Sequence, residues 1–303
     1  MIKVKLVLSV FLSMLVLSNL YAAGTLKPFI LASIESGDVA MVSEKTKSKL
    51  TEAGFTIAGS YSPYPDTIII GVTNETLKNA AAETKYGVFA AAQRVTITKG
   101  KKGKIQVAFT NPVYMSSAYQ LKNDLASVKQ ALVKALGEKQ TYGSLNGLTS
   151  ESLRDYQYKW LMPYFDDRLE LAEYSSHDTA VKAVAELLEK NTAGVSKVYR
   201  IDLPEKKGSL FGVYISEKSE DECAGDKYIM DSIDFQEIKS TGHLPYDMVV
   251  IGKKVFALRA EFRIAISFPD LSMMGSNSFA SIMCAPSAIE QTLTLAAGGE
   301  LEE

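Results

Sequence analysis

Two short segments of this chain occur twice, about half the chain length apart. Residues 123–128 (NDLASV) recur as residues 277–282 (NSFASI), and residues 105–112 (IQVAFTNP) resemble residues 262–269 (FRIAISFP). A repeat at this distance indicates one domain that is duplicated. We therefore expect two similar domains, packed on each other as a pseudo-two-fold pair.

The pattern of apolar and polar residues predicts the same kind of element order in each copy. In the first copy, alternation over residues 29–34 predicts a strand, residues 38–53 form a helix ended by Gly54, and Asn74 caps a second helix. In the second copy, we interpret residues 255–267 as a hairpin strand. The expected order is β-α-β-β-α-β-β-α, an α+β fold with antiparallel sheets backed by helices.

The beginning of the chain resembles a secretory signal peptide. A basic start with Lys3 and Lys5 precedes a short apolar run, and Tyr21-Ala22 offers a small-residue cleavage site. We therefore expect a periplasmic or secreted protein. The predicted organisation is a signal peptide at 1–22, a first domain at 25–148, a connecting helix at 149–168 and a second, divergent domain at 169–303.

The composition excludes two classes of partner. The formal net charge is −2, and no basic run forms an electrostatic footprint for nucleic acid. After the signal peptide, no apolar segment approaches the roughly 20 residues that a membrane helix needs. We expect neither nucleic-acid binding nor an integral membrane segment.

Two cysteines, Cys223 and Cys284, lie in the second copy. In an oxidising compartment, a pair of this kind favours a disulfide. The alternative is two separate buried thiols, because sequence alone does not supply the geometry of a bridge.

The connector between the copies is rich in aromatic residues. Leu153, Tyr156, Trp160 and Tyr164 recur at helical spacing, which predicts a helix whose apolar face packs between the copies with Trp160 buried. The alternative is a ligand cleft at the domain junction, where small-molecule sites often form. The ligand-cleft candidates are Tyr156, Tyr158, Trp160 and Tyr164.

Several segments of the first copy are similar to one known family. Residues 95–98 (VTIT), a Gly-Lys turn, residues 105–107 (IQV), residues 111–115 (NPVYM) and residues 123–125 (NDL) together resemble the domain-of-unknown-function family 302. The resemblance covers residues 25–137, and through the repeat it extends to residues 169–297.

The resemblance implies small α+β domains that are often dimeric, and it transfers no settled activity. Many family members carry Leu-Pro-Cys at the entry to the hairpin. This chain has Ala91-Ala92-Gln93 and Leu244-Pro245-Tyr246 at those places, so chemistry that depends on that thiol does not carry over.

A set of soft ligands in the second copy suggests a metal site. Imidazole, thioether and thiolate groups suit copper(I); the candidates are His243, Met273, Met274 and Met283, with Met248 and Cys284 nearby in sequence. The alternative is that the methionines fill an irregular core.

Other polar groups suggest no chemistry. With two histidines in the chain and no Gly-x-Ser-x-Gly elbow, we assign no catalytic residue. The acidic stretch at residues 217–226 is typical of a solvated loop.

These observations favour an exported, non-enzymatic binding or accessory protein for a small molecule or an envelope protein partner. The rival hypothesis is a periplasmic redox protein that binds copper or another cofactor. For the assembly, we expect either a monomer with pseudo-dimeric halves or a homodimer.

Overall fold

The computed structural model describes residues 24–219 and 221–301. The predicted signal peptide at residues 1–22 therefore lies outside the described residues. The helices within the described ranges are all too short or too polar to cross a membrane.

The first half is an antiparallel sheet with helices. Its elements are β1 (Phe29–Glu35), α1 (Val39–Glu52), β2 (Thr56–Tyr61), β3 (Thr67–Thr73), α2 (Glu75–Ala82), β4 (Gln93–Lys99), β5 (Ile105–Thr110), α3 (Pro112–Ala118), α4 (Ala126–Leu136) and β6 (Gln140–Tyr142). The strand order is β2-β3-β4-β5-β1-β6. The short helix α5 (Ser150–Arg154) follows this half.

The second half repeats this arrangement. Its elements are β7 (Leu169–Glu173), α6 (His177–Glu189), β8 (Val195–Leu203), β9 (Gly208–Ile215), α7 (Asp226–Ile233), β10 (Tyr246–Ile251), β11 (Lys254–Ala257), α8 (Ala260–Ser267) and α9 (Ala285–Ala296). The strand order β7-β11-β10-β9-β8 corresponds to β1-β5-β4-β3-β2 of the first sheet. The predicted α+β fold with two antiparallel sheets is confirmed.

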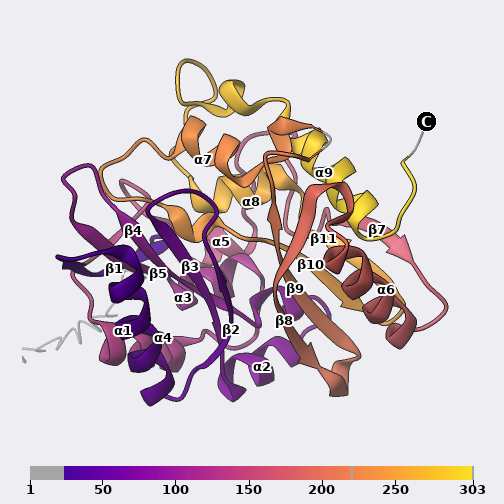
Figure 1. Ribbon diagram of the computed structural model, residues 1–303, viewed down its shortest axis with the longest axis horizontal. Coiled ribbons are helices and arrows are strands. Elements are labelled where there is room, and N and C mark those ends of the chain that lie inside the picture. Colours follow the sequence, from indigo (N-terminus) through magenta and orange to yellow (C-terminus); the bar gives the residue numbers. More distant parts are fainter. Residues whose placement is uncertain (1–23, 220, 302–303) are drawn as a thin grey trace, which may run out of the picture.

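Two helices of each half cover one face of its sheet. α1 and α4 pack on the first sheet, and α6 and α9 pack on the second (Figure 1). The other faces of the sheets are turned towards each other, and the edge strands β2 and β8 make contact. A hydrophobic core lies between each sheet and its helices, and Tyr199 and Ile201 of β8 extend the first core across the junction.

The two halves also pack on each other reciprocally. The 3₁₀ turn Gly87–Ala90, which precedes β4, contacts β9 and β10 of the second half. The 3₁₀ turn Thr241–His243, which precedes β10, contacts β4 and β5 of the first half. Because corresponding segments make corresponding contacts in both directions, the halves are related as in an isologous dimer.

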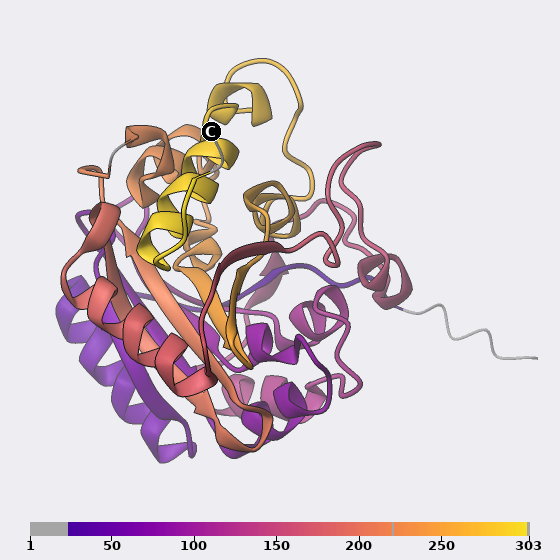
Figure 2. The same cartoon turned by 90° about the vertical axis from the view of Figure 1, so that its right-hand side faces the viewer.

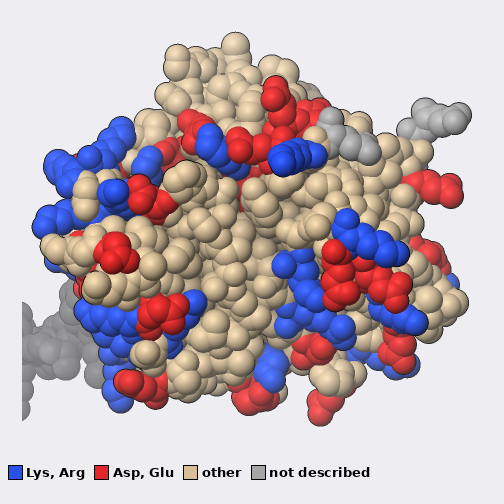
Figure 3. Space-filling model, in the orientation of Figure 1, with Lys and Arg blue, Asp and Glu red and all other residues tan. Residues whose placement is uncertain are grey.

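Charged side chains are distributed unevenly over the face on which β2 and β8 meet. In Figure 3, lysine, arginine, aspartate and glutamate side chains gather over both halves and leave a largely uncharged strip between them. The strip follows the junction of the two halves that Figure 1 shows in the same orientation. The junction therefore presents few charges on this face.

The segment that we predicted as a repeated strand is a helix. β11 ends at Ala257, and residues 260–267 form α8. The alternation of Phe262, Ile264 and Ile266 suggested a strand, but the residues between them, such as Arg263 and Ala265, are equally buried. A helix that is buried all round has no polar face, so its sequence cannot be told from a strand by periodicity.

The connecting helix is much shorter than we predicted. Only residues 150–154 are helical, and Figure 2 shows the rest of the connector as an extended loop on the outside of the molecule. Leu161 has a positive φ of 69°, which a right-handed helix does not contain. Pro163 follows Met162, and a proline disfavours helical backbone in the residue before it. The prediction that Trp160 is buried was therefore wrong, since 85% of it is exposed.

The predicted disulfide is confirmed. Cys223 and Cys284 are bridged, with Cα atoms 5.9 Å apart. The bridge joins the 3₁₀ turn Glu222–Ala224 to Cys284, the N-cap residue of α9. A disulfide of this kind fits an oxidising compartment.

Candidate functional site

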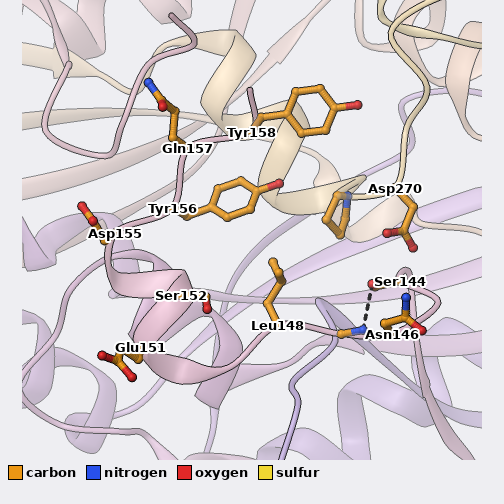
Figure 4. Close-up of a pocket in the computed structure, with 12 residues that line it drawn as sticks. Ser144, Asn146, Leu148, Glu151, Ser152, Asp155, Tyr156, Gln157, Tyr158 and Asp270 are labelled. Carbon is orange, nitrogen blue, oxygen red and sulfur yellow. Dashed lines mark hydrogen bonds between the residues drawn. The ribbon is translucent and has the colours of Figure 1, made fainter. Parts of the chain in front are cut away.

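A cleft of about 680 Å³ lies beside the connector, where the end of the first half meets the second half. Three segments line it: the loop before α5, the connector itself, and the residues after α8. The lining residues are Ser144, Asn146, Gly147, Leu148, Glu151, Ser152, Asp155, Tyr156, Gln157, Tyr158, Pro269 and Asp270 (Figure 4).

The loop at residues 144–148 is fixed at both of its ends. The Leu148 amide donates to the Leu26 carbonyl at 2.9 Å, and the Leu26 amide donates back at 2.7 Å. Gly147, with a φ of 72°, donates its amide to the Ser144 hydroxyl at 3.0 Å. The carboxylate of Asp270 accepts the Leu145 amide, so this loop is also tied to the second half.

Two tyrosines of the connector form the aromatic wall of the cleft. The Tyr156 hydroxyl donates to the Ala265 carbonyl at 3.3 Å, and the Tyr158 ring stacks on Phe279 with centroids 5.4 Å apart. In Figure 4 both side chains extend in the same direction, towards Asp270. These contacts hold both rings in place without a ligand.

The tyrosine hydroxyls stay protonated at neutral pH. Burial raises the pKa of Tyr156, and the neighbouring Tyr158 and Asp270 raise it further. Burial also raises the pKa of Tyr158, with a smaller contribution from Asp270. Both hydroxyl groups are therefore neutral: Tyr156 donates its proton to the Ala265 carbonyl, and Tyr158 can donate and accept.

The charged residues that line the cleft are carboxylates. Glu151, Asp155 and Asp270 are acidic, and in Figure 4 the first two lie at the edge opposite Asp270. Cations stand at the border: Lys27 donates to the Leu145 carbonyl at 3.1 Å, and the Lys159 ammonium lies 5.4 Å from the centroid of the Tyr158 ring. The lining is thus rich in hydrogen-bonding groups of both kinds, and its charged residues are all acidic.

A buried hydroxyl lies near the cleft. Tyr114 on α3 is fully buried, and its hydroxyl has no hydrogen-bond partner among the described residues. Burial raises its pKa, and the nearby Tyr156 and Asp270 contribute to the increase. A buried polar atom without a hydrogen-bond partner is uncommon. The core next to this cleft therefore contains a hydroxyl group whose hydrogen-bonding capacity is not used.

The structure brings two of the four ligand-cleft candidates together. Tyr156 and Tyr158 line the cleft, whereas Trp160 and Tyr164 do not. Sequence reasoning missed Asp270 and the loop at residues 144–148. The hydrogen bond between Leu145 and Asp270 spans 125 residues, and no local pattern in the sequence indicates a contact of that range.

The copper candidates are arranged differently. His243 is fully buried, and its ring nitrogens lie 3.1 Å from the Ser267 hydroxyl and 3.2 Å from the Tyr246 hydroxyl. Met274 and Met283 are 75% and 73% exposed, Met273 is 37% exposed, and Cys284 is in the disulfide. In this conformation both nitrogens of His243 are engaged, and the thiolate that we considered is not available.

Carboxylates elsewhere form no metal centre. Across residues 24–219 and 221–301, no group of three or more His, Cys, Asp or Glu side chains is placed to hold a metal ion. Within the acidic stretch that we interpreted as solvated, Asp226 is fully buried.

Asp226 and Asp234 lie on α7 and at its end, near a second, smaller cavity. This cavity of about 280 Å³ lies where the ends of β3 and β4 meet α7, with Tyr64, Lys99, Asp234 and Lys239 in its lining. Burial raises the pKa of Asp234 to about 6, although the charge of Lys239 and the Ser240 amide oppose the increase.

Comparison of the chain with protein-family models, with curated proteins and with solved structures found no match.

Proposed function

We propose that this chain is an exported, non-enzymatic binding or accessory protein that holds a small polar molecule in the cleft beside the connector. The observation that carries the proposal is the position of Tyr156 and Tyr158. Both line the cleft, and each is held by contacts to the second half. Aromatic walls with a few hydrogen-bonding groups are typical of small-molecule sites.

The chemistry of the lining supports a ligand with several hydroxyl, amide or amine groups. Ser144, Asn146 and the Tyr158 hydroxyl can both donate and accept hydrogen bonds, and three carboxylates accept them. The two histidines of the chain do not line the cleft. The lining thus favours binding and release of a ligand over its chemical conversion.

The disulfide and the pattern of residues 1–22 support export. A periplasmic or secreted location gives access to small molecules of the cell envelope or its surroundings. An envelope protein that receives or delivers the ligand would be the expected partner. In this proposal the similarity to family 302 describes the fold of each half and not the ligand.

Native mass spectrometry of protein purified from its own cell envelope tests the proposal. We expect an additional small mass on the wild-type chain that is absent from Tyr158→Ala. Tyr164→Ala is the matched control, because it removes a connector tyrosine outside the cleft lining and should retain the mass. Circular dichroism melts verify that both variants are folded. A wild-type chain without added mass, or equal retention by folded Tyr158→Ala, contradicts the proposal.

A further inference from the structure

Two rows of residues, one in each half, occupy equivalent positions in the two sheets. In each row, strand pairing aligns one residue on the edge strand, one on the next strand and one on the third. The first row comprises Gly59, Gly71 and Arg94. The second row comprises Tyr199, Gly212 and Asp247. Both rows start immediately after an irregularity in the edge strand, which supports the equivalence.

The third positions of the rows form a buried ion pair between the halves. A terminal nitrogen of Arg94 contacts Oδ2 of Asp247, and the two side chains are only 2% and 1% exposed. The Tyr199 hydroxyl donates to Oδ1 of the same carboxylate at 3.2 Å. Equivalent positions of the repeat thus carry opposite charges that neutralise each other.

The first two positions of the rows are complementary in size. The Tyr199 ring lies against the backbone of Gly71 and Gly212, where a Cβ atom on either glycine would collide with it. Gly59, the equivalent of Tyr199, lies so close to the Val198 carbonyl that a Cβ atom would not fit there either. The second half supplies the large Tyr199 side chain, and the space for it is left by Gly71 of the first half and by Gly212 of the second.

We propose that the two halves are obligate partners within one chain and that neither can form the same interface with its own copy. Self-pairing of the first half would place Arg94 against Arg94 and leave empty the space that Tyr199 fills. Self-pairing of the second half would place Asp247 against Asp247 and force two Tyr199 rings into one space. Buried like charges and overpacking both destabilise an interface. The protein is therefore a monomer whose junction accepts no second copy.

Charge exchange in the full chain tests the proposal. Arg94→Asp and Asp247→Arg should each lower the melting midpoint by about 10 °C, because each leaves two like charges buried. Asp247→Arg should be the more harmful change, since Arg263 is also buried at this junction and its charge reaches Tyr199. Arg94→Asp combined with Asp247→Arg should recover most of the loss.

Lys102→Glu is the control. Lys102 forms an exposed ion pair with Glu237 that also joins the halves, and its replacement should change the midpoint little.

Two further measurements keep the proposal testable if the charge-reversed chains do not fold. Arg94→Met with Asp247→Leu replaces the pair by apolar groups and should be more stable than either single change. Sedimentation equilibrium of the wild-type chain should give the mass of one chain at micromolar concentration. The proposal would be overturned if the single reversals had no effect, or if the double exchange or the apolar pair were no more stable than the single changes. A wild-type dimer would also overturn it.

Discussion

Asp226 is a carboxyl group buried between the halves, and no cationic side chain among the described residues pairs with it. The Tyr61 hydroxyl of β2 donates to its Oδ2 at 2.8 Å, and its Oδ1 has no hydrogen-bond partner among the described residues. Burial raises the pKa of Asp226 to about 8, which outweighs the opposing effect of the Tyr61 and Ile215 hydrogen bonds. At neutral pH this carboxyl group is therefore mainly protonated.

The shifted pKa predicts how stability depends on pH. Because the folded pKa lies above the ordinary value, Asp226 contributes its full stabilisation below pH 4 and loses it as pH rises through about 8. Asp226→Asn keeps a neutral side chain and should remove this part of the dependence, on the order of a few kcal/mol. Chemical unfolding between pH 4 and 9 measures it. Parallel pH profiles for wild type and variant would contradict the assignment.

Residues of this kind could not be predicted from the sequence. Asp226 closes a run of acidic residues that has the composition of a solvated loop. Its burial depends on the contact with Tyr61, which is 165 residues away in sequence. The same holds for Asp270 in the cleft, whereas Tyr156 and Tyr158 were identified because they are neighbours in one aromatic segment.

The elements with strong local signals were predicted well. Asp38 and Asn74 cap α1 and α2 with side-chain hydrogen bonds to Met41 and Leu77. The elements that differ from the prediction, the connector and α8, have apolar residues whose spacing fits more than one structure. Their conformation is decided by burial and by distant contacts, which local periodicity does not encode.

The loop conformation of the connector predicts a small role for Trp160 in stability. Trp160→Ala should change the free energy of unfolding by less than about 0.5 kcal/mol, because the side chain is largely exposed. Leu153→Ala in the same connector is the control and should cost about 2 to 5 kcal/mol, since Leu153 is fully buried. Urea denaturation followed by circular dichroism compares the two. A loss above 2 kcal/mol for Trp160→Ala would show that the connector is packed as we first predicted.

The disulfide should stabilise the second half. It closes a loop with a sequence separation of 61, for which chain entropy predicts about 4 kcal/mol. Replacing Cys223 and Cys284 by serine should lower the free energy of unfolding by about this amount, and the variant should not respond to reductant. Guanidinium unfolding with and without reductant provides the measurement, and an equal stability of oxidised and reduced protein would refute the expectation.

At the scale of the whole molecule, the junction should make the halves unfold together. The Arg94–Asp247 pair, the Tyr199 ring and the reciprocal turn contacts are all lost when either half unfolds. We expect one calorimetric transition whose van't Hoff enthalpy equals the calorimetric enthalpy. Two resolved transitions would mean that each half is stable without the other.

The cleft lies beside the connector, which is not part of the duplicated halves. The two sheets repeat, but the connector joins them at a single place, and connector residues form much of the lining of the cleft. The two sheets thus repeat as the sequence indicated, although residues 105–112 and 262–269, which we aligned, are a strand in one half and a helix in the other. The proposed binding site lies beside the connector, which does not repeat.

Hydrogen exchange of the envelope-purified protein tests the proposed cleft most directly. Exchange is measured first on the protein as purified. The protein is then unfolded and dialysed, which removes a bound small molecule, and is refolded with its disulfide intact before exchange is measured again. The account predicts that protection is lost in peptides covering residues 144–158 and 269–271, while peptides from α1 and α6 stay unchanged. Unchanged exchange throughout, or a change confined to other segments, would contradict a ligand in this cleft.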